Sequence, residues 1–397
     1  MTLNKNYLIF IGFVLTLLNL RFTFITGLQH DYVAVVQMSK EIINGANPWD
    51  LYGNFYGPLI WALTYLTKFH DLLPKIINFF MWNGALLIVL NKIKNDFFLK
   101  FFIFCLFNSP NFWIEIFKFG HLEGVLGFLV VSSLMFYQKK NYIISGFLIG
   151  LSICFKLTSL IIVPFLIFTS FSKKDLFKVK INYNFLISFF LTVATIYLFT
   201  ILIYDFKSVS NLIKIGFVKS EFMSFFRFLR GEFSPIPIIT IDILNYKKIE
   251  VISFLSYPLI LLFFFIIFYK FLDTKIDLKN SLLFITLIVP FLYKSGYAQY
   301  YTLHFIILFY YFAELPELKI KEFFENYSIL LLPLFFVTYF NFINAYEYNM
   351  FWGRDGKDPV WGGGNFGSLK IQEWAGLLSL FVTIPSLICY YKNKFKL

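Results

Sequence analysis

The sequence predicts an all-α polytopic membrane protein. Of its 397 residues, 58% are hydrophobic and 22% are aromatic, whereas only 15% are charged. Apolar runs that approach the length of a bilayer-crossing helix recur along the whole chain, and lysines collect between them. We therefore expect a single membrane domain over residues 1–397, with about 12 transmembrane helices. The protein is expected to be a multi-pass integral protein of the bacterial inner membrane.

The first span is expected at residues 7–27. Lys5 precedes it, which predicts a cytoplasmic N-terminus and places the first loop, residues 28–71, on the outer face. The next span, residues 72–90, returns the chain to a lysine-rich turn inside. Further spans are predicted at residues 101–110, 122–137, 185–203, 251–269, 282–291, 301–312, 329–342 and 374–390.

The first outer loop contains two expected interfacial helices. From Asp31 onward, apolar residues recur at helical spacing and polar residues fall mostly on the opposite side, which is typical of a helix lying in the membrane interface. Gly45 is placed to end this helix, and Pro48 prevents its continuation. The apolar run at residues 58–69 is too short to cross a bilayer, so it is expected to form a second interfacial or re-entrant helix.

Residues 142–170 are too long for one comfortable span and carry Lys156 at their middle. Because a lysine at the membrane centre is costly, we predict two short helices that meet at Lys156 on the outer face. The same topology places the longest polar connection, residues 204–250, outside.

The net charge and the positions of the cysteines limit the kinds of partner and site that the protein can have. A net charge of +12 at first suggests nucleic acid, but lysines between apolar runs are explained by positive-inside topology and anionic lipid headgroups. We therefore expect membrane lipids, and no nucleic acid, as partners. All three cysteines lie inside apolar segments, which argues against a disulfide framework or a cysteine-based metal site.

With this topology, most of the polar residues that are unusual for a membrane protein fall on the outer side. They come from separate connections: His30, Asp31, Glu115, Lys118, His121, Glu123, Lys156, Lys294, Tyr300 and His304. A site at the outer membrane surface requires such a set. We predict that Asp31, directly after the first span, acts as an acid–base group.

Each of these residues also has a plainer interpretation. Asp31 is well suited to cap the interfacial helix, a role compatible with proton transfer because a capped carboxylate stays ionised. The Lys156 side chain can extend toward the membrane–water interface, and His304 can form a hydrogen bond to a neighbouring helix.

The remaining polar residues also admit two interpretations. His121 and Glu123 can be ordinary loop residues. A metal site made of these two residues with His30 and Asp31 has no spacing signature, so no metal is predicted. The long loop contains three charged residues that either bind an anionic lipid headgroup or are simply solvated: Arg227, Arg230 and Glu232.

The ordered motifs of this chain resemble those of GT-C glycosyltransferases, most closely family 87, the polyprenol-phosphate-mannose-dependent mannosyltransferase type. The order and spacing agree over residues 8–164, with a looser match near Tyr300 and His304. The matching pieces are Asp31, Gly45-Ala-Asn-Pro48-Trp49, Phe55-Tyr56-Gly57-Pro58, Gly120-His121, Lys139-Lys140, Gly146-Phe-Leu-Ile-Gly150-Leu-Ser and Phe155-Lys156-Leu157. The chain departs from the pattern at three positions: His121 replaces a Gln, Gly57 replaces the first Pro of Tyr-Pro-Pro, and Leu157 replaces a Pro.

The resemblance implies a GT-C-like bundle with outer-face interfacial helices in the first loop. It implies a hexosyltransferase that moves a mannose-like sugar from a polyprenyl-phosphate donor to a lipid-linked or glycan acceptor, as in glycolipid biosynthesis. Asp31 is then the general base, and Lys156 stabilises the leaving phosphate. The resemblance gives His121 or His304 as helpers of Lys156. Together with the other polar residues of the outer side, the predicted substrate-binding set is His30, His121, Glu123, Lys156, Tyr300 and His304. Neither a cofactor nor a soluble nucleotide site is implied.

Two other functions fit a polytopic, aromatic-rich chain. A polysaccharide polymerase or ligase would use its large outer loop, so Arg227 and Arg230 would be essential and Asp31 dispensable. A sugar or lipid transporter would carry its substrate along a polar pathway at the membrane midplane. The sequence shows no clear inverted repeat, and its polar residues gather on one predicted face, which favours the glycosyltransferase.

Overall fold

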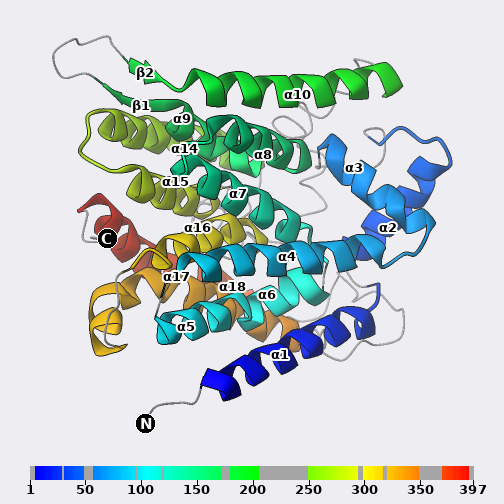
Figure 1. The fold of residues 1–397 in the computed structure, drawn as a ribbon, viewed down its shortest axis with the longest axis horizontal. Helices are drawn as coiled ribbons and strands as arrows, with labels where there is room; N and C mark the ends of the chain where they lie inside the picture. The colour runs from blue at the N-terminus through cyan, green and yellow to red at the C-terminus, as the bar shows by residue number, and fades with distance from the viewer. Residues whose placement is uncertain are drawn as a thin grey trace. The chain divides into compact units, whose positions relative to one another are not determined.

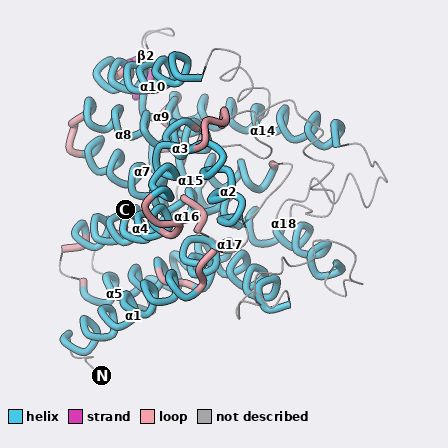
Figure 2. Tube along the Cα trace, turned by 90° about the vertical axis from the view of Figure 1, so that its right-hand side faces the viewer, coloured by secondary structure: helices cyan, strands magenta, loops and turns pink. Residues whose placement is uncertain are grey.

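A computed structural model describes residues 5–28, 31–48, 57–94, 96–118, 120–171, 179–204, 249–293, 298–315, 320–347 and 369–392. Helices account for most of these residues (Figures 1 and 2). The chain divides into two compact units. The first contains Met1–Leu157, Ser188–Ile213 and Leu308–Ile320, and the second contains Thr158–Ile187, Lys214–Ile307 and Lys321–Leu397.

Most of the first unit is built from helices within Met1–Leu157. In order they are α1 (Lys5–Ile25), α2 (Asp31–Ile43), α3 (Pro58–Thr64) with a 3-10 turn (Tyr65–Lys68), α4 (Leu73–Lys92), α5 (Phe97–Phe107), α6 (Pro110–Phe112), a π-helical turn (Trp113–Lys118), α7 (Glu123–Gln138) and α8 (Tyr142–Phe155). Helix α7 packs against both α4 and α8. The close approach of α4 and α7 depends on Gly124, because a Cβ there would lie 2.5 Å from the Asn78 carbonyl oxygen.

Most elements of the second unit come from later in the chain. They are a 3-10 turn (Leu157–Ile162), α9 (Val163–Ile167), strands β1 (Phe168–Phe171) and β2 (Val179–Ile181), α14 (Ile249–Leu272), α15 (Leu278–Leu292), a further 3-10 turn (Ala298–Tyr301), α17 (Ile320–Glu347) and α18 (Leu369–Tyr391). Helices α10 (Tyr183–Tyr204) and α16 (Thr302–Phe312) contribute to both units. The antiparallel pair β1–β2 was not predicted from the sequence.

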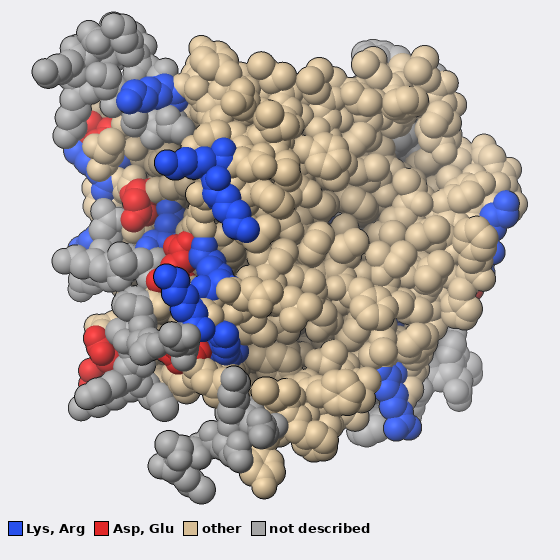
Figure 3. All heavy atoms as spheres, viewed as in Figure 1, with Lys and Arg blue, Asp and Glu red and all other residues tan. Residues whose placement is uncertain are grey.

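Three described helical segments are long and apolar enough to cross a membrane: Leu73–Lys92, Phe97–Lys118 and Tyr183–Tyr204. Helix α10 exposes many large apolar side chains, including Phe190, Phe199 and Leu202, of which Leu202 is 80% exposed. Such a surface is unfavourable in water and is normally solvated by lipid tails. The visible face in Figure 3 is mostly uncharged, with Lys and Arg gathered toward its margins. These features support a helical membrane protein, and the number of spans stays a prediction.

The amphipathic helix predicted from Asp31 is confirmed as α2 (Asp31–Ile43), while its place in the membrane interface stays a prediction. Its apolar residues Tyr32, Val35, Val36 and Ile42 are buried, whereas Gln37, Lys40 and Glu41 on the other side are exposed. Gly45 ends the helix with a positive φ of 97°, and the next N–H, that of Ala46, donates to the Glu41 carbonyl at 3.0 Å.

The predicted break at Lys156 is also confirmed. Helix α8 ends at Phe155, Lys156 has an extended backbone, with φ −152° and ψ 130°, and a 3-10 turn follows. The membrane face on which this break lies stays a prediction.

The connection predicted between the spans at residues 101–110 and 122–137 is different in the structure. The helix that begins with α5 continues, through α6 and the π-helical turn, as far as Lys118. The segment is mostly apolar, and Ile114, Ile116 and Phe117 are at most 1% exposed, so hydrophobic burial extends the helix. Only residues 119–122 connect it to α7.

Candidate active site

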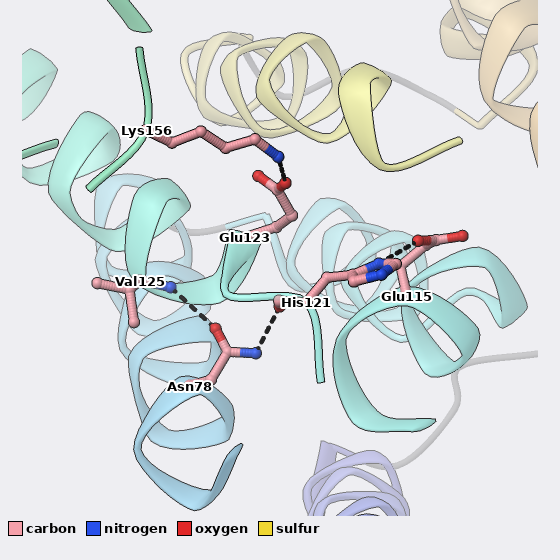
Figure 4. A network of polar contacts seen from close by, with 6 residues as sticks. All are labelled: Asn78, Glu115, His121, Glu123, Val125 and Lys156. Atoms are coloured by element: carbon pink, nitrogen blue, oxygen red, sulfur yellow. Dashed lines mark hydrogen bonds and ion pairs between the residues drawn. The ribbon is translucent and has the colours of Figure 1, made fainter. Parts of the chain in front are cut away.

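A buried carboxylate and a histidine form a pair at the start of the connection between the π-helical turn and α7 (Figure 4). The Glu115 Oε2 atom lies 2.7 Å from His121 Nδ1, and the two side chains are only 5% and 7% exposed. The His121 backbone N–H also donates to the Glu115 carbonyl at 3.0 Å. The two residues are therefore held together by both side chain and backbone.

A second buried pair lies two residues further along. Glu123, the first residue of α7, forms an ion pair with Lys156 at the end of α8. Their side chains are 4% and 15% exposed, and Figure 4 shows the lysine extending across to the carboxylate. The Lys156 charge is therefore balanced by a carboxylate, which the sequence did not predict.

Asn78 on α4 fixes the connection between these pairs. Its side-chain amide donates to the His121 carbonyl at 2.8 Å, and its Oδ1 accepts from the Val125 N–H at 3.1 Å (Figure 4). One asparagine thus satisfies a buried carbonyl on one side of the turn and the first turn of α7 on the other.

Gly120 brings the start of α2 against this connection. Its φ of +66° is in the region that favours glycine, and a Cβ there would lie 2.9 Å from the Tyr32 ring. The Tyr32 hydroxyl donates to the Asp71 carbonyl at 2.7 Å. Burial raises the pKa of the Tyr32 phenol above its usual value, so it stays a neutral donor. Since Asp31 precedes Tyr32 in α2, its backbone lies near the turn that carries His121.

Lys75 ties the end of α1 to the same region. Its side chain is completely buried, and its ammonium donates to Thr26 Oγ1 at 2.9 Å and to the Gly27 carbonyl at 3.0 Å. Its backbone N–H donates to the Tyr32 hydroxyl at 3.3 Å. Lys75 therefore contacts the residues on both sides of the short connection that leads to Asp31. A cation is also favourable at the C-terminal end of a helix such as α1.

The Gly57-Pro58 motif meets the Lys156 break directly. The Gly57 N–H donates to the Phe155 carbonyl at 2.9 Å, one residue before Lys156, and a Cβ on Gly57 would overlap the Cys154 carbonyl. Position 57 therefore needs a residue with an N–H and without a Cβ, which excludes proline and favours glycine.

Replacing Gly57 with alanine is expected to lower the free energy of unfolding by about 1–3 kcal/mol, because the added methyl group collides with a backbone carbonyl that cannot rotate away. The measurement is the midpoint of thermal unfolding of the purified protein in detergent. The matched control is Gly12→Ala on α1, where a Cβ would have only ordinary contacts, 3.6 Å from the Phe104 ring. Equal midpoints for the two variants would contradict the close approach.

An apolar cluster includes residues next to these polar contacts in the sequence. Ile42 from α2, Trp61 from α3 and Leu122 from the turn before α7 are buried together, and Phe155 packs against them. The stretches that carry the candidate residues are therefore joined by hydrophobic packing as well as by hydrogen bonds.

The structure brings together only some of the residues predicted from the sequence. His121, Glu123 and Lys156 lie in one network, with the start of α2 at Asp31 beside it. The Asp31 side chain lies outside the described structure. So do these other residues named from the sequence: His30, Trp49, Phe55, Tyr56, Arg227, Arg230, Glu232 and Lys294.

Tyr300 and His304 belong to the second unit. His304 is fully buried on α16, with Nδ1 3.2 Å from Thr286 Oγ1 of α15 and Nε2 3.2 Å from the Tyr390 hydroxyl of α18. These contacts correspond to the helix-linking interpretation of His304. The Tyr300 ring packs edge-on against Tyr293, with ring centroids 5.8 Å apart.

Three contributors to the network were missed or undervalued at the sequence level. Glu115 was noted as polar but not placed in the site, and Lys75 and Asn78 were not singled out. The available signal was their position, because charged or amide side chains near the end of an apolar span are costly unless they have partners. Within the described ranges, no three His, Cys, Asp or Glu side chains lie close enough to hold a metal ion.

The comparisons with known proteins give one informative similarity. No family model and no solved structure matches the chain. The chain is 28% identical over 170 residues to GPI mannosyltransferase 1 of Dictyostelium discoideum, a match that covers 39% of this chain and 37% of that protein. The matched region thus spans well under half the length of either protein. The similarity supports the resemblance to GT-C glycosyltransferases and does not select family 87 among them.

Proposed function

We propose that this protein is a membrane mannosyltransferase that moves a mannose-like hexose from a polyprenyl-phosphate sugar to a lipid-linked or glycan acceptor at the outer face. The observation that carries the proposal is a convergence of motifs. The start of α2 at Asp31, the Gly57 motif, the Gly120-His121 turn and the Lys156 break lie far apart in the sequence and pack together in the first unit. The name of the similar protein favours mannose as the sugar.

In this proposal Asp31 activates the acceptor. A hydroxyl is a poor nucleophile, so a base must take its proton as the oxygen attacks the anomeric carbon of the sugar. Asp31 is the first residue of α2, and the positive end of a helix stabilises an ionised carboxylate. The ionised carboxylate is the form that accepts a proton.

The leaving group is a lipid phosphate, whose negative charge grows as the glycosidic bond breaks. Lys156 and His121 are the groups proposed to stabilise it. Glu123 holds the Lys156 side chain and Glu115 holds that of His121. Fixed donors of this kind need little reorganisation during the reaction, which is the main requirement for electrostatic stabilisation. Because the phosphate already activates the sugar, no step in this mechanism requires a metal ion.

The test is a panel of donors presented to the purified protein in detergent with native lipid extract as acceptor. The panel contains short-chain polyprenyl phosphates carrying mannose, glucose or galactose, together with GDP-mannose as a soluble control. We expect transfer from polyprenyl-phosphate mannose and none from the nucleotide sugar. Transfer from another polyprenyl-phosphate sugar would keep the reaction type and change the sugar. Use of the nucleotide sugar alone would refute the proposed donor class.

A further inference from the structure

We propose that Glu115 is a positioning residue, which orients the His121 ring so that Nε2 is the atom that contacts a phosphate oxygen of the donor. This inference rests on the proposed function. It adds the role of Glu115 and names Nε2 as the ring atom of His121 that meets the donor. Glu115 itself contacts His121 and does not contact the substrate.

The first support is the number of contacts that fix His121. Its Nδ1 faces Glu115 Oε2 at 2.7 Å, its N–H donates to the Glu115 carbonyl at 3.0 Å, and its own carbonyl accepts from Asn78 at 2.8 Å. In a histidine with Nδ1 bound to a carboxylate, that bond sets the tautomer and the ring orientation, and Nε2 is the nitrogen that acts on other groups. His121 therefore has the arrangement of an oriented functional histidine.

The second support is the local backbone. Glu115 lies in the π-helical turn Trp113–Lys118, a rare conformation that occurs frequently at functional sites. Gly120, next to His121, has a positive φ that keeps the connection short. A purely structural connection would not require an unusual turn on one side and a glycine-specific conformation on the other.

The third support is the energetic cost of the pair. The Glu115 side chain is only 5% exposed, and burying a carboxylate is strongly unfavourable unless a partner compensates it. Apolar residues of similar size would fill the same space at lower cost. A buried Glu–His pair beside the Glu123–Lys156 pair is therefore better explained by a requirement at His121 than by packing.

Two replacements of His121 separate the two ring nitrogens. Glutamine places its amide near the Nε2 position, whereas asparagine places its amide near the Nδ1 position and so can keep the bond to Glu115. We expect His121→Gln to retain transfer within about tenfold of the unaltered protein and His121→Asn to lose about 100-fold in kcat. If asparagine retains more activity than glutamine, the Nδ1 contact is the essential feature, and the proposal is wrong.

Glu115→Gln provides the second measurement, made alone and in the His121→Gln background. Alone, it should lower kcat with little change in the KM for the acceptor, because the ring loses its orientation. In the His121→Gln background it should cost no further activity, because no ring remains to be oriented. An equal loss in both backgrounds would show a structural role and overturn the proposal. Thermal unfolding of each variant in detergent identifies any variant that has lost its fold.

The outcomes for this inference and for the proposed function are distinct. If the unaltered, folded protein transfers sugar from no polyprenyl-phosphate donor, the proposed function is wrong and the role of Glu115 is refuted with it. If the unaltered protein transfers sugar but the asparagine variant is the more active one, only the role of Glu115 is refuted.

Discussion

Replacing Asp31 with asparagine is expected to lower the rate of sugar transfer by about 100- to 10,000-fold, the contribution typical of a general base. Asparagine has nearly the same shape as aspartate, so α2 should still begin at residue 31. The amide cannot accept the proton of the attacking hydroxyl. The measurement is kcat for transfer from polyprenyl-phosphate mannose to native lipid acceptor in detergent.

The control for this prediction is Asp71→Asn. Asp71 is a carboxylate of the same loop, and it is 34% exposed and forms an ion pair with Lys40 at 3.0 Å. An exposed ion pair contributes at most about 1 kcal/mol, so this variant should fold and transfer sugar normally. Near-normal turnover by the Asp31→Asn protein, or an equal loss in both variants, would contradict the assignment of Asp31 as the base.

Replacing Lys156 with methionine is expected to have the second-largest effect, on both stability and activity. The change removes one partner of a buried ion pair and leaves Glu123, whose side chain is 4% exposed, without its counter-charge. Breaking a buried pair in this way costs about 3–5 kcal/mol of folding free energy. It also removes a cation proposed to stabilise the leaving phosphate, so transfer should fall as well.

A double variant separates these two effects. In Lys156→Met with Glu123→Gln, no unpaired charge remains, so the midpoint of thermal unfolding should recover most of the way to that of the unaltered protein. Transfer should stay low, because the cation is still absent. Recovery of both stability and transfer would show that Lys156 has only a structural role. The control is Glu123→Gln alone, which removes the carboxylate of the pair and keeps the Lys156 cation.

The sequence predicted those parts of the fold that depend on local pattern. The periodicity from Asp31 together with Gly45 defined both ends of α2, because a one-sided apolar stripe and a left-handed glycine are local signals. The cost of a lysine at the membrane centre correctly predicted the break at Lys156.

The parts that were missed depend on partners far away in the chain. A charged residue within an apolar run predicts a loop between two spans if no partner for its charge is known. This reasoning wrongly placed Glu115 and Lys118 in a loop rather than in a helix. The partner of Glu115 becomes apparent only when the turn at Gly120 is known. Likewise, the bond between Gly57 and Phe155 joins residues almost 100 positions apart, and no local signal indicates it.

The candidate site could be predicted only in part, because the sequence does not show which side chains pair with one another. The family resemblance indicated His121 and Lys156, but it gave neither Glu115 nor Glu123 as their partners. It also grouped His304 with them, although the contacts of His304 are to α15 and α18 within the second unit. Aromatic and histidine residues near the end of a span resemble a site in sequence, while in the structure they satisfy one another between helices.

The most direct test of the proposed function is the transfer of radiolabelled mannose from polyprenyl-phosphate mannose by the purified protein, with native lipid extract as acceptor and Asp31→Asn in parallel. We predict a labelled lipid or glycan product with the unaltered protein and almost none with the variant. A folded protein that consumes no donor would contradict the proposed function. It would favour a polymerase, tested at Arg227 and Arg230, or a transporter.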